Sequence, residues 1–434
     1  MELKPGYKKT EVGVIPEDWE VKPLGECLND QPRYGINAPA VNYSDYLPVY
    51  IRITDISEDG QFSPELLVSV DNPHSKNYYL NEGDIVFART GASVGKSYRY
   101  KLQDGPLVYA GFLIRIRTNE QILLPAFLSS YVTTSNYWNW VRMVSTRSSR
   151  PGVNGKQFKQ LLVPIPTLLE QTAIATVLSD TDALIESLEQ LIAKKRLIKQ
   201  GAMQALLTGK RRLPGFAQKT GYKHTEVGVI PEDWEVKRLG EVGVISGGGV
   251  DKKIRPQELP VRLVNYMDVY KRSFIRSVDL EHTVSATSEQ ITRCNVREGD
   301  IFFTPSSEMP FDIAMSAVAI ENIPDACYSY HIIRLRLHEK WDIKFCAYAF
   351  KTGAFLSQAA RICEGSGIRY VITQARFRHL IISYPQDRRE QTAIATILSD
   401  MDEEITALEE KLSKYRQIKQ GMMQELLTGR IRLV

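Results

Sequence analysis

Residues 170–182 read EQTAIATVLSDTD, and residues 390–402 read EQTAIATILSDMD. The ends of these segments are also shared, with KQGAMQALLTGKRRL in the first copy and KQGMMQELLTGRIRL in the second. Further upstream, GYKKTEVGVIPEDWEVKPLGE over 6–26 returns as GYKHTEVGVIPEDWEVKRLGE over 221–241. Between the repeated segments lie long stretches that hardly match. Because self-similar segments fold into similar structural units, we predict two half-proteins built on one scaffold.

A stripe of apolar residues runs along both repeated segments in steps of three and four. This heptad-like pattern predicts a long helix with one apolar seam in each half. The seam residues are Ile174, Leu178, Ile185, Leu188, Ile192 and Ile198 in the first helix, and Ile394, Leu398, Met401, Ile405, Leu408, Leu412, Tyr415 and Ile418 in the second. We expect the two seams to pack on each other, because each stripe is as long as its helix. The alternative is that each helix packs only on its own globular part. Lys195 also falls on the first seam, and the sequence identifies no partner for it.

Both helices carry signals at their ends. Thr167 stands three residues before Glu170, and Asp387 three before Glu390, which is the spacing of a capping box. A glycine follows the last helical turn of each copy, where a left-handed cap is expected. These glycines are Gly209 and Gly429.

The parts of the chain outside the helices read as β-rich domains. Short runs of β-branched and aromatic residues, such as those that begin at Asp84, Gly111 and His331, predict strands. Trp19 and Trp234 in the repeated segments are expected to be core anchors. The chain is therefore of the α+β class, with two β-rich domains and two long helices. The predicted segments are a domain over 1–166, a helix over 167–209, a domain over 210–386 and a helix over 387–434.

Composition leaves the binding partner open. A net charge of +4 and a pI near 8.6 are compatible with nucleic-acid binding but do not indicate it. The first residues contain no apolar run and the chain has no stretch long enough to span a membrane, so we expect a cytoplasmic protein. The five cysteines form no C-x-x-C pair, which indicates reduced thiols rather than a zinc or disulfide framework.

Motifs that would indicate catalysis are incomplete or missing. Residues 91–97, GASVGKS, resemble a phosphate-binding loop, but Thr90 stands where the first glycine is required. An ATPase that uses Lys96 is therefore a further alternative, which nucleotide binding would test. The six scattered histidines offer no metal cluster. We predict that the chain is not an enzyme and that it holds neither a catalytic residue nor a metal.

Basic and polar loops lie in the parts that differ between the copies. Arginine, lysine, asparagine and serine are suited to phosphate contacts and to base-edge recognition, so these loops are candidate DNA-binding residues. In the first half they are Arg33, Tyr34, Arg89, Thr90, Lys96, Arg147, Ser148, Arg150 and Asn154. In the second half they are Lys252, Lys253, Arg255, Ser306, Ser307, Arg361, Arg369 and Tyr370. A protein that reads two different half-sites has to differ between copies in such loops.

The whole arrangement resembles the specificity (S) subunit of type I restriction–modification systems. The resemblance rests on the motifs that recur, which are Pro166 to Ile174 with the Leu207–Lys210 helix end, and their second-half equivalents, Pro385 to Ile394 with Leu427–Arg430. It implies two target-recognition domains, an antiparallel coiled coil between them and a pseudo-twofold axis. The chain departs from the family in the loop that contains Arg89, Gly91 and Gly95, because the second copy keeps none of the three.

The resemblance also implies a function. The chain would bind double-stranded DNA at a bipartite, asymmetric target and assemble two methyltransferase (M) subunits and, in the full complex, restriction (R) subunits. S-adenosylmethionine, ATP and Mg²⁺ would be bound by those partners, with no cofactor on this chain. No membrane is expected as a partner. A two-lobed coiled-coil scaffold without DNA specificity is the alternative.

Overall fold

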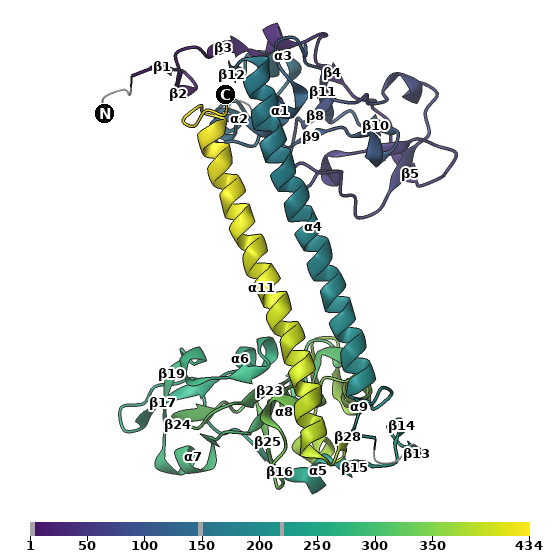
Figure 1. The fold of residues 1–434 in the computed structure, drawn as a ribbon, viewed down its shortest axis with the longest axis vertical. Coiled ribbons are helices and arrows are strands. Elements are labelled where there is room, and N and C mark those ends of the chain that lie inside the picture. Colours follow the sequence, from purple (N-terminus) through teal and green to yellow (C-terminus); the bar gives the residue numbers. More distant parts are fainter. Residues whose placement is uncertain (1–4, 146–150, 218–220) are drawn as a thin grey trace. The chain divides into compact units, whose positions relative to one another are not determined.

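The computed structural model describes residues 5–145, 151–217 and 221–434. Two compact units are present: the first consists of Met1–Glu189 with Glu410–Val434, and the second of Gln190–Glu409. The two long helices are α4 (Leu168–Leu206) and α11 (Arg388–Leu426), each of 39 residues. Each unit therefore contains one β-rich domain, the first part of the helix that follows it in the chain, and the last part of the other helix (Figure 1).

The first unit is built on two four-stranded sheets with strand orders β4-β11-β8-β9 and β10-β6-β7-β5. A hairpin β1-β2 and the pair β12-β3 complete it. The strands are β1 (Tyr7–Thr10), β2 (Gly13–Pro16), β3 (Glu20–Pro23), β4 (Arg33–Tyr34), β5 (Ala40–Asn42), β6 (Val49–Ile51), β7 (Val68–Val70), β8 (Ile85–Ala88), β9 (Ser97–Arg99), β10 (Leu107–Tyr109), β11 (Leu113–Ile116) and β12 (Leu162–Ile165). The short helices are α1 (Pro125–Tyr131), α2 (Ser135–Ser145) and α3 (Gly155–Lys159).

The second unit repeats this plan with additions. Its sheets have the orders β16-β25-β21-β23-β18, β19-β17-β24-β20 and β22-β27-β26, with the pairs β13-β14 and β15-β28. The strands are β13 (Tyr222–Thr225), β14 (Gly228–Pro231), β15 (Trp234–Arg238), β16 (Gly243–Gly247), β17 (Leu259–Val264), β18 (Phe274–Ile275), β19 (Thr283–Ala286), β20 (Asn295–Val296), β21 (Ile301–Phe303), β22 (Ser306–Ser307), β23 (Ser316–Ala319), β24 (Ile323–Tyr328), β25 (Ile333–Leu337), β26 (Glu364–Ser366), β27 (Arg369–Val371) and β28 (Ile381–Pro385). The short helices are α5 (Leu239–Val242), α6 (Tyr266–Lys271), α7 (Ser288–Arg293), α8 (Ile343–Ala349), α9 (Gly353–Ile362) and α10 (Gln374–Phe377).

The helices share a hydrophobic core with each domain. In the first unit, Ile174 and Leu178 of α4 belong to the same buried cluster as Phe87 of the sheet and Leu426 at the end of α11. In the second unit the equivalent cluster contains Leu206 at the end of α4 together with Ile394 and Leu398 of α11. Burial of apolar surface is the main driving force of folding, so the end of α11 is part of a domain that lies far from it in sequence, and the end of α4 is part of the domain that follows it.

Ion pairs join α4 and α11 within each unit. In the first unit, Lys419 Nζ lies 2.5 Å from Asp182 Oδ1, and Arg416 pairs with Glu189. The second unit repeats both pairs with the roles of the helices exchanged, since Lys199 binds Asp402 and Arg196 binds Glu409. In both units the pairing residues rise along one helix while they fall along the other, so the paired segments are antiparallel.

Three statements about the seam need correction. Ile198 and Ile418 were predicted to be seam residues, but both are exposed, at 47% and 40%. The regular alternation of four and three steps places Lys199 and Lys419 on the paired face, and their long stems can cover apolar surface while their ammonium groups bind aspartates. Lys195 does have a partner, because its Nζ lies 2.6 Å from Glu404 Oε1.

A separate correction concerns the start of each long helix. Thr167 Oγ1 accepts a hydrogen bond from the backbone of Glu170, as a capping box requires, but the carboxylate of Glu170 does not return to the cap. It accepts hydrogen bonds from Trp19 Nε1, at 2.9 Å, and from Arg432, so it is part of a buried ion cluster instead. In the second unit both oxygens of Glu390 accept hydrogen bonds from Arg212.

Those ion clusters explain why three separate motifs are repeated. Arg432, from the TGRIRL end of the chain, binds both oxygens of Glu170 and both oxygens of Asp18 in the PEDWE motif. Trp19 is fully buried beneath it, and the Arg432 guanidinium lies 5.9 Å from the ring centroid. Two bidentate pairs hold one guanidinium in a fixed orientation. The same contacts recur in the second unit among Arg212, Asp233, Glu390 and Trp234.

Glycine caps direct the chain from each helix end into its cluster. Gly209 and Gly429 have φ of +69° and +68°, as predicted for left-handed caps. A Cβ on Gly429 would lie 2.4 Å from Pro16 Cδ, so no other residue fits without displacement of the backbone.

Replacing Gly429 with alanine is expected to lower the free energy of unfolding by about 1–3 kcal/mol, from left-handed strain and from the clash with Pro16. Gly421→Ala is the matched control, because Gly421 lies in α11 with open space around it, and this change should instead stabilise by about 0.5–1 kcal/mol. Denaturant unfolding of the full chain measures both. Equal effects for the two variants would contradict the assignment of the cap.

Three further observations concern predictions made above. Trp19 and Trp234 are buried in the two cores, as expected. The GASVGKS loop leads into strand β9 and not into a helix, so it lacks the structure of a phosphate-binding loop. In the part of the chain that the structure describes, no helix is long and apolar enough to cross a membrane.

Candidate nucleic-acid interface

One pair of candidate loops in each half occupies the same place in its domain. In the first unit, the backbone after β8 binds the segment before α3, with Val153 N donating to Arg89 O at 2.9 Å and Thr90 bridged to Gly152. In the second unit, the backbone after β21 binds the segment before α10, with Ile372 N donating to Pro305 O at 2.8 Å. The sequence-variable loops are therefore carried on one shared pairing of backbone segments.

The first unit brings together three of its candidate residues at this pairing. The guanidinium of Arg89 lies over the ring of Tyr34, 5.0 Å from its centroid, and Tyr34 Oη accepts a hydrogen bond from the backbone of Gly155. Asn154 caps α3 through its side chain, which accepts from Gln157 N at 2.9 Å. Arg89 Nε is buried and has no hydrogen-bond partner among the described residues. Tyr34 is 43% exposed, so a ring and a cation are presented side by side.

The other candidates of the first half lie in varied settings. Arg33 is exposed on the edge strand β4, in register with Arg115 of β11. Lys96 does not join the Tyr34–Arg89 pair, because its Nζ is bound to Glu58 at 2.7 Å. Arg147, Ser148 and Arg150 lie outside the described residues.

The second unit forms a small three-stranded sheet at the equivalent place. Strand β22 pairs with β27, which sets Ser306 opposite Val371 and Ser307 opposite Tyr370. Arg369, at the start of β27, donates from Nη2 to Ser306 Oγ at 3.3 Å. Four of the predicted residues, Ser306, Ser307, Arg369 and Tyr370, therefore lie on two paired strands.

Ser306, Ser307 and Arg369 line a hollow of about 660 Å³. Its other walls include two stacked tyrosines of α6, Tyr266 and Tyr270, with ring centroids 5.8 Å apart. The remaining lining residues are Met267, Glu308, Met309, Asp312, His331 and Ile368. A hollow of this size, with aromatic faces, hydroxyls and one arginine, can take a nucleobase or a sugar–phosphate unit.

Sequence reasoning did not find Tyr266, Tyr270 and His331. The tyrosines stand four residues apart on α6, a spacing that places two rings on one helix face. This spacing was visible in the sequence, but nothing in it indicated that the face lies against the Ser306 strand. His331 belongs to the turn before β25 and gave no local signal.

The other candidates of the second half are dispersed. Arg255 is bound by Asp251 and Glu258, so its charge is largely compensated. The backbone of Lys253 is tied into the same turn through Asp251 Oδ1. The charge of Lys252 contributes to lowering the pKa of His331, a residue that lines the hollow. Arg361 lines a different depression, beside Arg376 and His379, and does not join Arg369.

The pKa of His331 reports on this arrangement. Burial holds the His331 pKa below its ordinary value, and the nearby charges of Arg369 and Lys252 lower it further. We expect Arg369→Ala to raise the His331 pKa, because one repelling cation is removed. Arg361→Ala is the matched control and should leave it unchanged. An NMR titration of the His331 ring protons measures both, and an equal response to the two variants would show that Arg369 does not face His331.

The site offers hydrogen-bond donors, cations and aromatic faces. Within the described ranges, no group of three or more His, Cys, Asp or Glu side chains is placed to hold a metal ion. Two domains of one fold thus carry different polar and aromatic surfaces at one position, which defines a duplicated protein with copy-specific faces.

Comparison with known proteins identifies the family. The model of the type I restriction modification DNA specificity domain matches residues 16–194 and 231–419. The chain therefore belongs to the family of type I restriction–modification specificity subunits.

Two relatives from Methanocaldococcus jannaschii illustrate the range of similarity. The putative type I restriction enzyme MjaX specificity subunit is 32% identical over 240 residues, which is 54% of this chain and 55% of that protein. The type I restriction enzyme MjaVIII specificity subunit is 24% identical over 428 residues, covering 96% of this chain and 94% of the relative.

Solved structures share the fold. A type I restriction–modification S subunit from M. genitalium aligns with a TM-score of 0.56 at 12% identity, over 98% of both chains. A chain from a structure of type I R-M complex assembly and conformational transition aligns with a TM-score of 0.54 at 16% identity, over 96% of this chain and 99% of that one.

Proposed function

We propose that this chain is the non-catalytic DNA-recognition subunit of a type I restriction–modification complex. The observation that carries the proposal is the pair of unlike surfaces on one shared frame. Arg89, Tyr34 and Asn154 gather in the first unit, and Arg369 and Ser306 gather at the equivalent strands of the second. Such a chain would read a bipartite, asymmetric target, one half-site with each surface.

The proposed architecture has target-recognition domains over 1–166 and 210–386, spaced by helices over 167–209 and 387–434. We propose that the helices form an antiparallel coiled coil with a pseudo-twofold axis. Support comes from the interhelical pairs, because Lys419–Asp182 and Arg416–Glu189 in one unit have the equivalents Lys199–Asp402 and Arg196–Glu409 in the other. The exchange of helix roles is what twofold symmetry would produce.

The partners follow from the family. The chain would bind two methyltransferase subunits and, in the complete complex, restriction subunits, in the cytoplasm. S-adenosylmethionine, ATP and Mg²⁺ would be held by those subunits. Of the residues proposed from the sequence, Arg255 and Arg361 lie apart from the two surfaces. The others remain the candidate DNA-binding residues, with Tyr266, Tyr270 and His331 added.

Two measurements test the function. Methylome sequencing of a host that carries the complete system gives both half-sites and the gap between them. Fluorescence anisotropy with a duplex of that sequence should then show affinity that falls steeply with salt, because phosphate contacts release counterions. Salt-independent binding, or equal affinity for a scrambled duplex, would favour a scaffold without DNA specificity.

A ruler role for the helices gives a separate prediction. One heptad inserted between Leu191 and Ile198, with a matching heptad between Lys411 and Ile418, should lengthen the helix pair by about 10 Å. The gap between recognised half-sites should grow by about three base pairs, since B-DNA rises ~3.4 Å per pair. Methylome sequencing reads the new gap directly. A host whose methylated motif keeps its original gap would remove the ruler role.

A further inference from the structure

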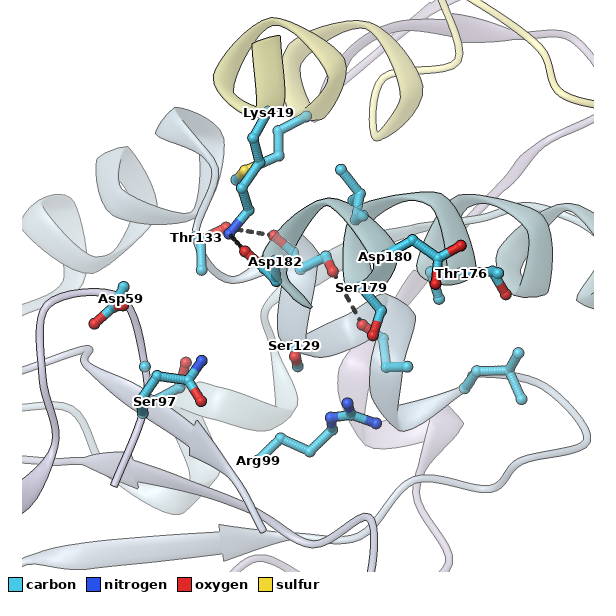
Figure 2. Close-up of a pocket in the computed structure, with 18 of the residues that line it drawn as sticks. Asp59, Ser97, Arg99, Ser129, Thr133, Thr176, Ser179, Asp180, Asp182 and Lys419 are labelled. Carbon is cyan, nitrogen blue, oxygen red and sulfur yellow. Dashed lines mark hydrogen bonds and ion pairs between the residues drawn. The ribbon is translucent and has the colours of Figure 1, made fainter. Parts of the chain in front are cut away.

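The first unit contains a cavity of about 420 Å³ that the loops described above do not use. Figure 2 shows Lys419 reaching from α11 to Asp182 of α4 on one side, with Ser97 and Arg99 of β9 on the other. The helix walls contribute Thr172, Thr176, Ser179, Asp180 and Met423, and α1 contributes Ser129 with Ser130 and, just beyond it, Thr133. The walls formed by α4 and α1 are therefore rich in small hydroxyl side chains, and longer side chains such as Gln61, Arg99 and Lys101 complete the lining.

The second unit has the same walls. Repeat alignment places Ser399, Asp402 and Lys199 where the first unit has Ser179, Asp182 and Lys419. The short helices also correspond, because the backbone of Leu124 donates to Gln171 Oε1 and that of Asp342 to Gln391 Oε1, both at 2.8 Å. Counting from these anchors, Ser130 corresponds to Tyr348 and Thr133 to Lys351.

Large side chains fill this space in the second unit. Tyr348 is fully buried, and its Oη donates to Asp402 Oδ2 at 2.9 Å and lies 3.4 Å from Ser399 Oγ. Lys199 lies over its ring, 5.6 Å from the centroid, and Phe274 of β18 meets its edge. Lys351 binds Ser273 Oγ at 2.6 Å, beside β18.

Neither Tyr348 nor Lys351 has a counterpart of its size in the first unit, where Ser130 and Thr133 take their places. The hydroxyls of Ser130 and Thr133 bind carbonyls of their own segment, at 3.1 and 2.7 Å, and so stay close to the backbone. Strand β9 is an edge strand of its sheet, whereas the edge of its counterpart β23 is paired with β18. The groups equivalent to those that contact the phenol of Tyr348 in the second unit therefore line an open cavity in the first unit.

We propose that this cavity binds a tyrosine side chain of a partner polypeptide, with its hydroxyl directed to Asp182 and Ser179 and its ring beneath Lys419. A polypeptide fits better than a free phenol, because the volume exceeds that of one ring and the second unit fills the same space from two segments of chain. The site is separate from the DNA-recognition surfaces, so its test does not depend on them.

Saturation-transfer NMR of the full chain with N-acetyl-tyrosinamide tests the proposal. The probe should bind with a dissociation constant on the order of 1 mM, and N-acetyl-phenylalaninamide, which lacks the hydroxyl, should bind at least tenfold more weakly. In Ser130→Tyr/Thr133→Lys, which copies the second unit into the first, the signal should disappear while the protein stays folded. Binding that is absent in the natural chain, or unchanged in this variant, would overturn the site.

A reciprocal variant provides the matched control. Tyr348→Ser/Lys351→Thr opens the second unit and should add a second site for the same probe. If this variant does not fold, Ser130→Tyr alone with the two probes decides the question.

A blocked helical peptide with Tyr and Lys three residues apart should bind at least tenfold more tightly than N-acetyl-tyrosinamide, and its Tyr→Phe form should not. Equal affinity of peptide and single amino acid would overturn the assignment to a polypeptide.

Discussion

Arg432→Ala is expected to lower the free energy of unfolding of the first unit by about 3–5 kcal/mol, although only Leu433 and Val434 follow it in the described chain. Its guanidinium binds Glu170, which is fully buried, and the substitution leaves that carboxylate without its cation. An uncompensated buried charge costs far more than the loss of an exposed ion pair. Trp19 would retain its hydrogen bond to Glu170 but lose the cation above its ring.

The chain offers close controls for this experiment. Arg430, two residues away, forms an exposed pair with Glu425, and Arg430→Ala should change stability by less than about 1 kcal/mol. Arg212→Ala should reproduce the large effect in the second unit, where Arg212 binds Glu390 and Asp233. Hydrogen exchange can assign each loss, since Arg432→Ala should expose amides of β3 and the start of α4. A small, equal effect of all three variants would show that the cluster does not hold the helix ends.

The same contacts predict a change in the titration of Asp18. The hydrogen bonds from Arg432 hold the Asp18 pKa below its ordinary value. The stabilisation from this pair is therefore present above the ordinary carboxyl pKa and is lost as pH falls through the lowered value. In Arg432→Ala the Asp18 pKa should rise, which a carboxyl-detected NMR titration measures.

Arg369→Ala should weaken binding to the cognate duplex by roughly 10- to 100-fold, corresponding to about 1–3 kcal/mol. Arg369 is the arginine that lines the hollow beside the stacked tyrosines, and its bond to Ser306 Oγ leaves the other guanidinium nitrogens for a base or a phosphate. If it contacts a base, the methylome should show relaxed specificity in one half-site alone. If it contacts a phosphate, affinity should fall for all sequences and the salt slope should decrease by about one.

Two arginines of the same half serve as controls. Arg361 lines another depression, and Arg255 is already bound by two carboxylates, so their alanine variants should change affinity less than about twofold. Anisotropy titrations at two salt concentrations separate these cases. Full affinity in Arg369→Ala would exclude the hollow from the DNA interface.

The sequence predicted the elements well because local and repeated patterns encode them. Heptad spacing predicted both long helices, and the glycines at 209 and 429 predicted their left-handed ends. The sequence pattern could not reveal that the carboxylate of Glu170 binds Arg432 instead of the helix cap, because the two residues are 262 positions apart. Ile198 was placed on the seam on hydrophobicity alone, whereas the periodicity selects Lys199, whose charge Asp402 compensates.

The candidate surface was predictable only in part. Residues adjacent on one strand, such as Ser306 and Ser307, remained together, whereas Arg361 and Arg369 separated because a helix end and a turn lie between them. Tyr266 joined the hollow through its hydrogen bond to Ser306 O, a contact between segments 40 residues apart. Side chains that meet only through tertiary pairing leave no spacing in the sequence to detect.

The swapped helix ends have a consequence for synthesis on the ribosome. The first domain is translated early, yet the residues that complete its core, Leu426 and Leu427, and the cation of its ion cluster, Arg432, emerge only after the whole second domain. At about 5–20 residues per second, the nascent domain would wait roughly 10–50 s with Glu170 and the apolar start of α4 uncovered. The ion cluster of the second unit has no such delay, because its cation, Arg212, is translated before the second domain. Truncated or stalled translation products would therefore carry an exposed apolar surface on their first domain and would be natural clients for chaperones and proteases.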